Sequence, residues 1–61
     1  MNTKFQSRYT TFEKEEWFYV AWNHFRGGMI FTEKFATNED RKIFIELHFK
    51  NFKPVTSFTE D

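Results

Sequence analysis

The segment from Thr10 to Gly28 constrains the fold more than any other, because its start, body and stop signals all indicate one helix. Thr10 and Glu13 have the spacing of a capping box, in which a hydroxyl and a carboxylate satisfy the N–H groups of a first helical turn. Gly27 and Gly28 supply a left-handed C-cap without steric cost. The sequence therefore predicts an amphipathic helix over residues 11–26.

The body of this predicted helix carries one apolar stripe. On a 3.6-residue repeat the stripe consists of Trp17, Phe18, Ala21, Trp22 and Phe25. An alternative stays open, because Trp, Phe, Tyr and Val are strand formers and residues 17–25, followed by Arg26-Gly27-Gly28, would also make one arm of a hairpin. The helix is favoured because Glu13, Glu15 and Glu16 place negative charge at the positive end of a helix dipole.

Other segments alternate between apolar and polar residues, as strands do. Residues 3–9 and 29–36 are short segments of this kind. Residues 41–52 alternate for longer, with Ile43, Ile45, Leu47 and Phe49 on one face. Thr37 with Asp40 would instead cap a helix at this point. A strand is favoured, because the helical wheel of this segment is apolar nearly all round.

The expected order is strand–helix–strand–strand in a single small domain of 61 residues. The expected fold class is α+β: a small β-α-β-β domain whose three-stranded, mainly antiparallel sheet is covered on one face by the helix of residues 11–26. Pro54 ends the last strand because it has no N–H, so residues 54–61 are a tail, either frayed or a short extra strand. Without cysteine, the ten Phe, two Trp and two Tyr must supply the stability of so short a chain.

No pattern in the sequence indicates an enzyme, a metal site or a cofactor. The two histidines, His24 and His48, lack the spacing of a zinc motif. There is no cysteine nucleophile, no serine in an elbow context and no glycine pattern that would cradle a phosphate. We expect no catalytic residue, no metal and no cofactor. The strongest enzymatic alternative is a minimal nuclease built from Arg41, His48 and Lys50.

The outer face of the predicted strand 41–52 is the candidate partner-binding surface. It alternates aromatic and basic groups, namely Phe44, His48, Lys50, Phe52 and Lys42, with Arg8 joining them from the first strand. Rings between cations suit a single strand of RNA or DNA. Aromatic anchors with a charged rim equally suit a protein. A protein partner is favoured because Glu46 would repel phosphates and the nine basic residues only balance nine acidic ones.

The sequence thus predicts a non-enzymatic binding protein that uses the open face of its sheet. The favoured function is a protein–protein interaction module that inhibits or regulates its partner, as adaptors, antitoxins and phage-type inhibitors do. The alternatives are a single-stranded RNA- or DNA-binding protein and a structural homo-oligomer subunit. Fourteen rings exceed what so small a core can cover, so we expect a homodimer. The start of the chain carries no secretory signal and its longest apolar run is far shorter than a membrane span, so we expect a cytoplasmic protein with no membrane segment.

Overall fold

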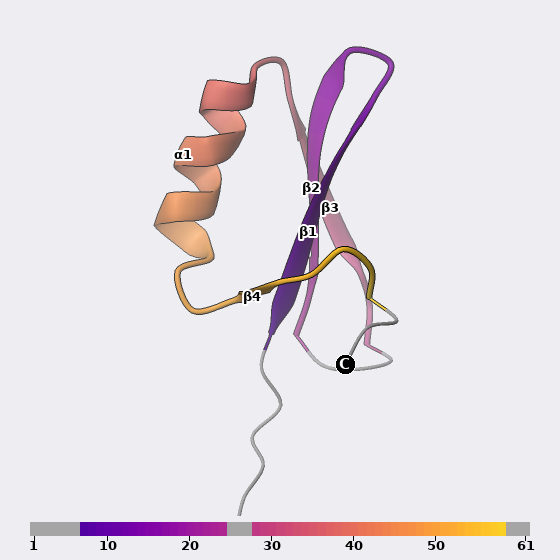
Figure 1. Cartoon of the computed structure of the whole chain (residues 1–61), viewed down its shortest axis with the longest axis vertical. Helices are drawn as coiled ribbons and strands as arrows, with labels where there is room; N and C mark the ends of the chain where they lie inside the picture. Colours follow the sequence, from indigo (N-terminus) through magenta and orange to yellow (C-terminus); the bar gives the residue numbers. More distant parts are fainter. Residues whose placement is uncertain (1–6, 25–27, 59–61) are drawn as a thin grey trace, which may run out of the picture.

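The computed structural model describes residues 7–24 and 28–58. Its elements in chain order are β1 (Arg8–Lys14), β2 (Trp17–Asn23), β3 (Phe31–Phe35), α1 (Asn38–His48) and β4 (Lys53–Pro54). The strands form one mixed sheet in the order β3-β2-β1-β4, and α1 packs on one of its faces (Figure 1). The protein is a small α+β domain, as expected from the sequence. The order of its elements, the number of strands and the position of the helix differ from the prediction.

The predicted helix over residues 11–26 is wrong, because residues 8–23 form a β-hairpin. β1 and β2 pair antiparallel from Arg8 opposite Asn23 to the last pair beside the turn. The turn consists of Glu15 and Glu16, both with positive φ, 53° and 71°, which is the pattern of a two-residue type I′ connection. The strand alternative is correct for residues 17–23, although the hairpin turns at Glu15-Glu16 and not after residue 25: the run of Trp, Phe, Tyr and Val fits a pleated surface with side chains on both faces. The predicted helix stop at Gly27 lies outside the described residues.

The predicted strand over residues 41–52 is also wrong, because most of it belongs to α1. Thr37 is the N-cap, and its Oγ1 accepts a hydrogen bond of 3.1 Å from the N–H of Asp40. At the other end the N–H of Phe49 donates to the carbonyl of Ile45 over 2.8 Å. The cap and the acidic first turn therefore decide the structure here. The apolar alternation that favoured a strand has another cause, since some of these residues face the sheet and others face solvent.

The remaining predicted elements fare better. The strand expected over residues 29–36 is confirmed as β3. Of the strand expected over residues 3–9, residues 3–6 lie outside the described part of the chain, and β1 begins at Arg8. A strand not expected from the sequence, β4, pairs parallel with the start of β1; it overlaps the predicted tail of residues 54–61 only at Pro54, and residues 55–58 form no strand. Its neighbour Val55 donates its N–H to the carbonyl of Tyr9 over 2.9 Å. No helix in the described residues is long and apolar enough to cross a membrane.

The core lies between the sheet and α1 and is built largely from aromatic rings. Trp22 on β2 contacts Phe44 of α1 and the C-cap residue Phe49, with ring centroids 6.1 and 5.1 Å apart. Phe35 on β3 packs against Phe44 at 5.1 Å, and Val20 between them in the sheet is fully buried. These contacts join residues far apart in the sequence, so they hold the helix on the sheet.

Candidate binding surface

The six residues predicted as a partner-binding site do not share one face. Phe44 packs in the core against Trp22 and Phe35, and its ring also lies 4.6 Å from that of His48. Lys42 is exposed on α1. Because helical periodicity turns neighbouring residues to different sides, Lys42 and Phe44 do not form the alternating surface that a strand would give them.

The other predicted residues are also dispersed. Lys50 is exposed just beyond the C-cap of α1. Phe52 is half-buried, and its ring contacts those of Phe49 and His24 at 4.6 and 5.7 Å. Arg8 is buried, with its guanidinium 5.8 Å from the centroid of the Phe58 ring. The geometric basis of the predicted site, a strand over residues 41–52, is absent.

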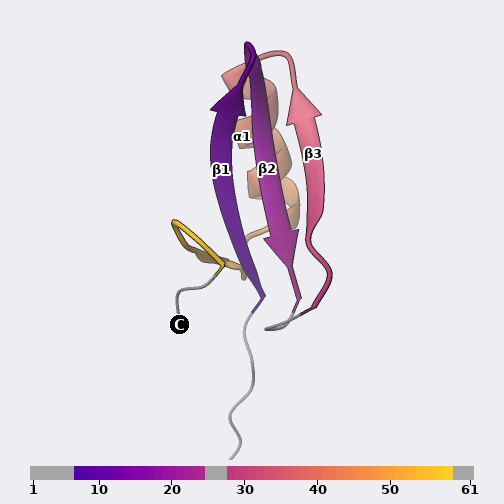
Figure 2. The same cartoon turned by 90° about the vertical axis from the view of Figure 1, so that its right-hand side faces the viewer.

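A different surface collects aromatic and basic side chains: the face of the sheet turned away from α1. Figure 2 looks onto this open face, with β1, β2 and β3 side by side in front and α1 behind them. Side chains alternate between the two faces of a strand, and paired residues on neighbouring strands share a face. The pairing therefore assigns to the open face Arg8, Thr10, Phe12 and Lys14 of β1, Trp17, Tyr19, Ala21 and Asn23 of β2, and Thr32 and Lys34 of β3, of which Arg8, Ala21 and Asn23 are buried.

Three aromatic rings form the centre of this open face. Phe12 and Tyr19 are cross-strand partners, and their rings stack 4.8 Å apart with planes only 4° from parallel. Trp17 follows on the same face of β2, and the Nζ of Lys34 lies 4.4 Å from the centroid of its ring. Phe12 and Trp17 remain 40% and 39% exposed. We call these four side chains, Phe12, Trp17, Tyr19 and Lys34, the aromatic cluster.

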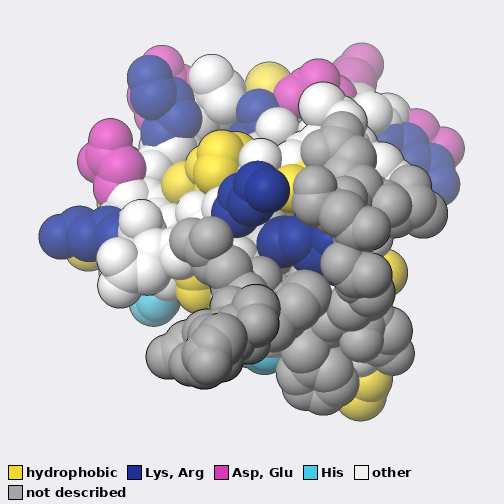
Figure 3. All heavy atoms as spheres, turned by 60° about the horizontal axis from the view of Figure 1, so that its bottom comes forward, with side chains coloured by type: hydrophobic (Ala, Val, Ile, Leu, Met, Phe, Trp, Pro, Cys, Tyr) yellow, Lys and Arg dark blue, Asp and Glu magenta, His cyan; other side chains and the backbone are white. Residues whose placement is uncertain are grey.

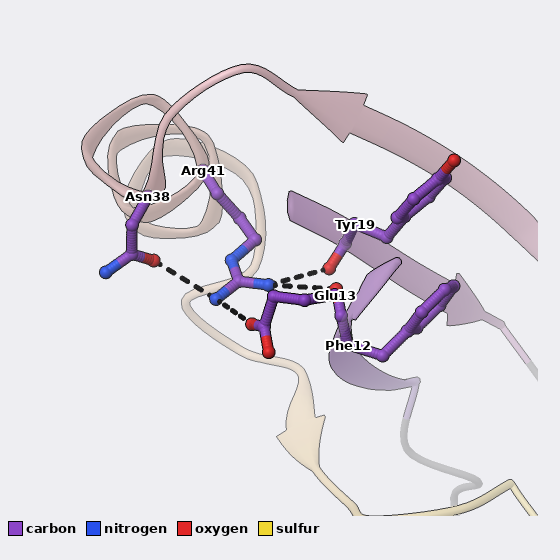
Figure 4. Close-up of polar contacts among 5 residues, drawn as sticks. All are labelled: Phe12, Glu13, Tyr19, Asn38 and Arg41. Carbon is purple, nitrogen blue, oxygen red and sulfur yellow. Dashed lines mark hydrogen bonds and ion pairs between the residues drawn. The ribbon is translucent and has the colours of Figure 1, made fainter. Parts of the chain in front are cut away.

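Behind the aromatic cluster, Arg41 of α1 fixes the backbone that carries it. Its Nη1 donates to the carbonyl oxygens of Phe12 and Tyr19 over 3.2 and 3.1 Å. Its Nη2 donates to Oδ1 of Asn38 over 3.1 Å and forms an ion pair of 3.0 Å with Glu13. Figure 4 shows this arrangement: Glu13 reaches toward the guanidinium, and the two rings point away from the helix. The side of the cluster that faces the core is therefore held by a buried cation.

The guanidinium also packs against the core side of the hairpin. Its Cζ lies 5.3 Å from the centroid of the Phe18 ring, on the face of β2 opposite the aromatic cluster. Arginine suits this position because its planar group donates several hydrogen bonds in fixed directions and stacks on an aromatic face at the same time. The cluster consequently stands on a rigid support and not on a loop.

Charges of both signs surround the aromatic cluster. Lys14 is exposed beside it, while Glu15 and Glu16 occupy the exposed turn of the hairpin. A shallow depression at this end of the molecule is lined by Glu15, Glu16, Trp17 and Ala36. Figure 3, which brings the opposite end of the molecule forward, shows basic side chains beside hydrophobic ones, with acidic side chains toward the rim. The described surface in that view is mixed in charge.

Sequence reasoning placed Phe12, Trp17, Tyr19 and Lys34 on a helix or an ordinary strand, and so missed the aromatic cluster. The signal that would have found it is the strand alternative for residues 17–25 together with a turn at Glu15-Glu16, which pairs this strand with β1. That pairing alone puts Phe12 beside Tyr19. No group of three or more potential metal ligands comes together within residues 7–24 and 28–58.

Comparisons with known proteins do not assign a family. No family model, no curated protein and no solved structure matches this chain. The interpretation of the open face therefore rests on the contacts of its own residues.

Proposed function

We propose that the protein is a protein–protein interaction module that docks a partner on the open face of its sheet and thereby inhibits or regulates that partner. The observation that supports this proposal best is the aromatic cluster, in which exposed Phe12 and Trp17 and half-buried Tyr19 stand on a hairpin. Aromatic side chains with a fixed geometry are typical anchors of protein interfaces. They bury a large area and lose little conformational entropy on binding.

The arrangement of the rings favours a protein over a nucleic acid. A base stacks on an open ring face. Phe12 and Tyr19 cover one face of each other, and the Lys34 ammonium lies over the ring of Trp17. A protein partner can pack its apolar side chains against the edges of these rings. The chain also has no net positive charge that would attract phosphates from a distance.

The rim indicates the chemistry of the partner. Lys14 is exposed beside Phe12, and Lys34 projects from β3 across Trp17. Both lysines therefore border the apolar centre of the face. We propose that the partner presents an apolar protrusion with carboxylates opposite these lysines and a basic group opposite Glu15 and Glu16 of the turn, because opposite charges at a rim align two surfaces and speed their encounter.

Single-stranded nucleic acid is the second candidate, and one observation favours it. Glu46, which stood in the middle of the predicted surface, lies on α1 and away from the open face, whose strand positions carry Lys14 and Lys34. A titration with mixed single-stranded oligonucleotides at low salt tests this candidate, using the fluorescence of Trp17 and Trp22. Salt-sensitive micromolar binding that Phe12→Ser abolishes would replace the protein proposal.

The main experiment is affinity capture on the immobilised protein from a lysate of the producing cell, with and without nuclease. We expect a partner that resists nuclease and is lost with Trp17→Ala. With that partner purified, Trp17→Ala should weaken binding by about 30-fold, as expected when an interface anchor worth about 2 kcal/mol is truncated. Met29→Ser is the matched control, because Met29 is 74% exposed and lies outside the strands of the open face.

Two results would contradict the protein proposal. One is capture that nuclease abolishes. The other is equal capture by the wild-type protein, Trp17→Ala and Met29→Ser, all shown to be folded by circular dichroism, since the aromatic cluster would then play no part in binding.

A further inference from the structure

The outer face of α1 is a second apolar surface, on the side of the molecule opposite the open face (Figures 1 and 2). Ile43 and Leu47 are 54% and 70% exposed. They are four residues apart, so they lie one above the other on the helix. Two large aliphatic side chains exposed together on a regular element indicate a contact with another surface more strongly than single exposed residues do.

Charges of opposite sign mark the two ends of this apolar pair. Glu39 lies one turn before Ile43, and Lys50 follows Leu47 by three residues, just past the C-cap. Spacings of four residues keep Glu39, Ile43 and Leu47 on one side of α1, whereas Lys50 comes after the helix has ended at His48. This side of α1 is therefore acidic at its start and apolar in its middle, with exposed Glu46 beside the apolar pair, and a basic residue follows the end of the helix. We call Glu39, Ile43, Leu47 and Lys50 the outer stripe.

We propose that the outer stripe pairs with the same stripe of a second copy of this chain, with the two α1 helices antiparallel about a two-fold axis between Ile43 and Leu47. Ile43 then packs against Leu47 of the second copy, and Glu39 meets Lys50 of the second copy, at both ends by symmetry. Antiparallel pairing brings opposite charges together at both ends of the stripe. A parallel pair would place Glu39 beside Glu39 and Lys50 beside Lys50.

An alternative dimer would pair β3 with β3, since this strand is at one end of the sheet order. The register that overlaps the whole of β3 places Phe31 opposite Phe35 and Glu33 opposite Glu33 of the second copy. Like charges directly opposite each other in a sheet are destabilising. The charge pattern therefore favours α1 over β3 as the contact between copies.

Pairing through α1 adds a property that is independent of what the open face binds. The open face is on the other side of the sheet from α1, so both copies keep it accessible and it points outward in the dimer. Two apolar residues per copy bury a small area, so the association is weak, with a dissociation constant on the order of 10–100 µM. A dimer of this kind presents two binding faces, and a multivalent target would be bound more tightly than by one.

Charge reversal tests the pairing directly, with sedimentation equilibrium over about 10–500 µM as the measurement. Glu39→Lys or Lys50→Glu alone creates like-charge contacts at both ends and should weaken association by about 5- to 10-fold. The double variant Glu39→Lys/Lys50→Glu restores opposite charges and should return the dissociation constant to within about 2-fold of the wild type.

The double variant separates pairing from helix stability. Both substitutions oppose the helix dipole, so the double variant should have the least stable helix of the set, measured by circular dichroism, and yet regain the dimer. Leu47→Ser should abolish dimerisation, and the matched control Met29→Ser should leave it unchanged. A wild-type protein that stays monomeric over the whole concentration range, or a double variant as weak as the single ones, would overturn the proposal. A dimer that survives Leu47→Ser but responds to Glu33→Lys would assign the contact to β3.

Discussion

The two faces of the sheet carry similar aromatic side chains but give them different partners. On the face under α1, Trp22 contacts Phe44 and Phe49, which come more than twenty residues later in the chain. On the open face, Phe12 contacts Tyr19 across the hairpin, and Trp17 contacts Lys34 of the neighbouring strand. The covered face therefore joins the helix to the sheet, whereas the open face joins strands that already pair through their backbones.

This difference separates residues needed for stability from residues available for binding. Truncating a ring that contacts two elements removes a contact that holds them together, so it destabilises the whole fold. Truncating a ring that packs only on a hairpin should cost less stability, because the backbone hydrogen bonds between the strands remain. In a chain of 61 residues, whose total stability is expected to be only about 3–5 kcal/mol, the contrast should be large.

The largest expected effect is on the covered face. Trp22→Ala should destabilise the protein by about 3–5 kcal/mol and leave it largely unfolded, because the ring links β2 to Phe44 and Phe49. Trp17→Ala, the same substitution on the open face, should cost less than about 1 kcal/mol. Urea unfolding followed by circular dichroism measures both. Equal losses for the two variants would break the distinction between the faces.

The next effect concerns Arg41, a helix side chain that hydrogen-bonds to the backbone of the hairpin. Arg41→Ala removes hydrogen bonds to the carbonyls of Phe12 and Tyr19 and the contact with Phe18. We expect a loss of about 2–3 kcal/mol, as is usual for hydrogen bonds from a charged group that is buried.

Glu13→Gln is the matched control for Arg41→Ala. The Glu13 side chain is 59% exposed, so its ion pair is screened by water and the substitution should cost less than about 1 kcal/mol. If Glu13→Gln proved as harmful as Arg41→Ala, the ion pair and not the carbonyl contacts would hold the helix to the hairpin.

The coarse fold was predictable from the sequence, but the assignment of helix and strand was not. An α+β domain with one helix on a sheet and a strand at β3 follow from apolar patterning. The hairpin was hidden because its turn, Glu15-Glu16, lacks the Gly and Asn that usually mark positive φ. The same acidic residues resemble the first turn of a helix. The rings of residues 17–22 lie on both strand faces, so their pattern also fits a helical stripe.

The residue types of the candidate surface were predictable from the sequence, but the segment that carries them was not. Aromatic and basic residues on an open sheet face were expected, but on the wrong segment. Phe44 and Phe52 are as aromatic as Phe12 and Trp17, and the sequence alone does not say which rings the helix covers. Which rings are covered depends on the register of β1 with β2 and on the position of Arg41, and both are set by the tertiary structure.

A smaller effect tests the helix boundary that the sequence left as an alternative. Thr37→Ala removes the side-chain acceptor of the Asp40 N–H and should destabilise the protein by about 1 kcal/mol. Thr37→Ser keeps the hydroxyl and should stay close to the wild type. Because this cap lies at the start of α1, Thr37→Ala should weaken the packing of α1 on the covered face without changing partner binding on the open face. A loss of binding in the folded variant would show that the two faces are coupled.

The smallest expected effect is a gain, at the turn that joins β1 to β2. Glu15 and Glu16 both adopt positive φ, where a side chain with a Cβ is strained. Replacing them with Asn and Gly, the pair that a type I′ turn favours, should stabilise the protein by about 0.5–1 kcal/mol, since the relief of strain is partly offset by the greater freedom of Gly when unfolded. Thermal unfolding measures the gain, and Glu16→Ala, which keeps a Cβ at a positive φ, is the control that should not show it.

The variant with Asn and Gly at the turn also tests the contrast between the faces. The substitution leaves every ring of the aromatic cluster in place, so binding through these rings should persist in the stabilised protein. Stabilisation accompanied by loss of the partner would instead assign recognition to the two glutamates at the tip of the hairpin.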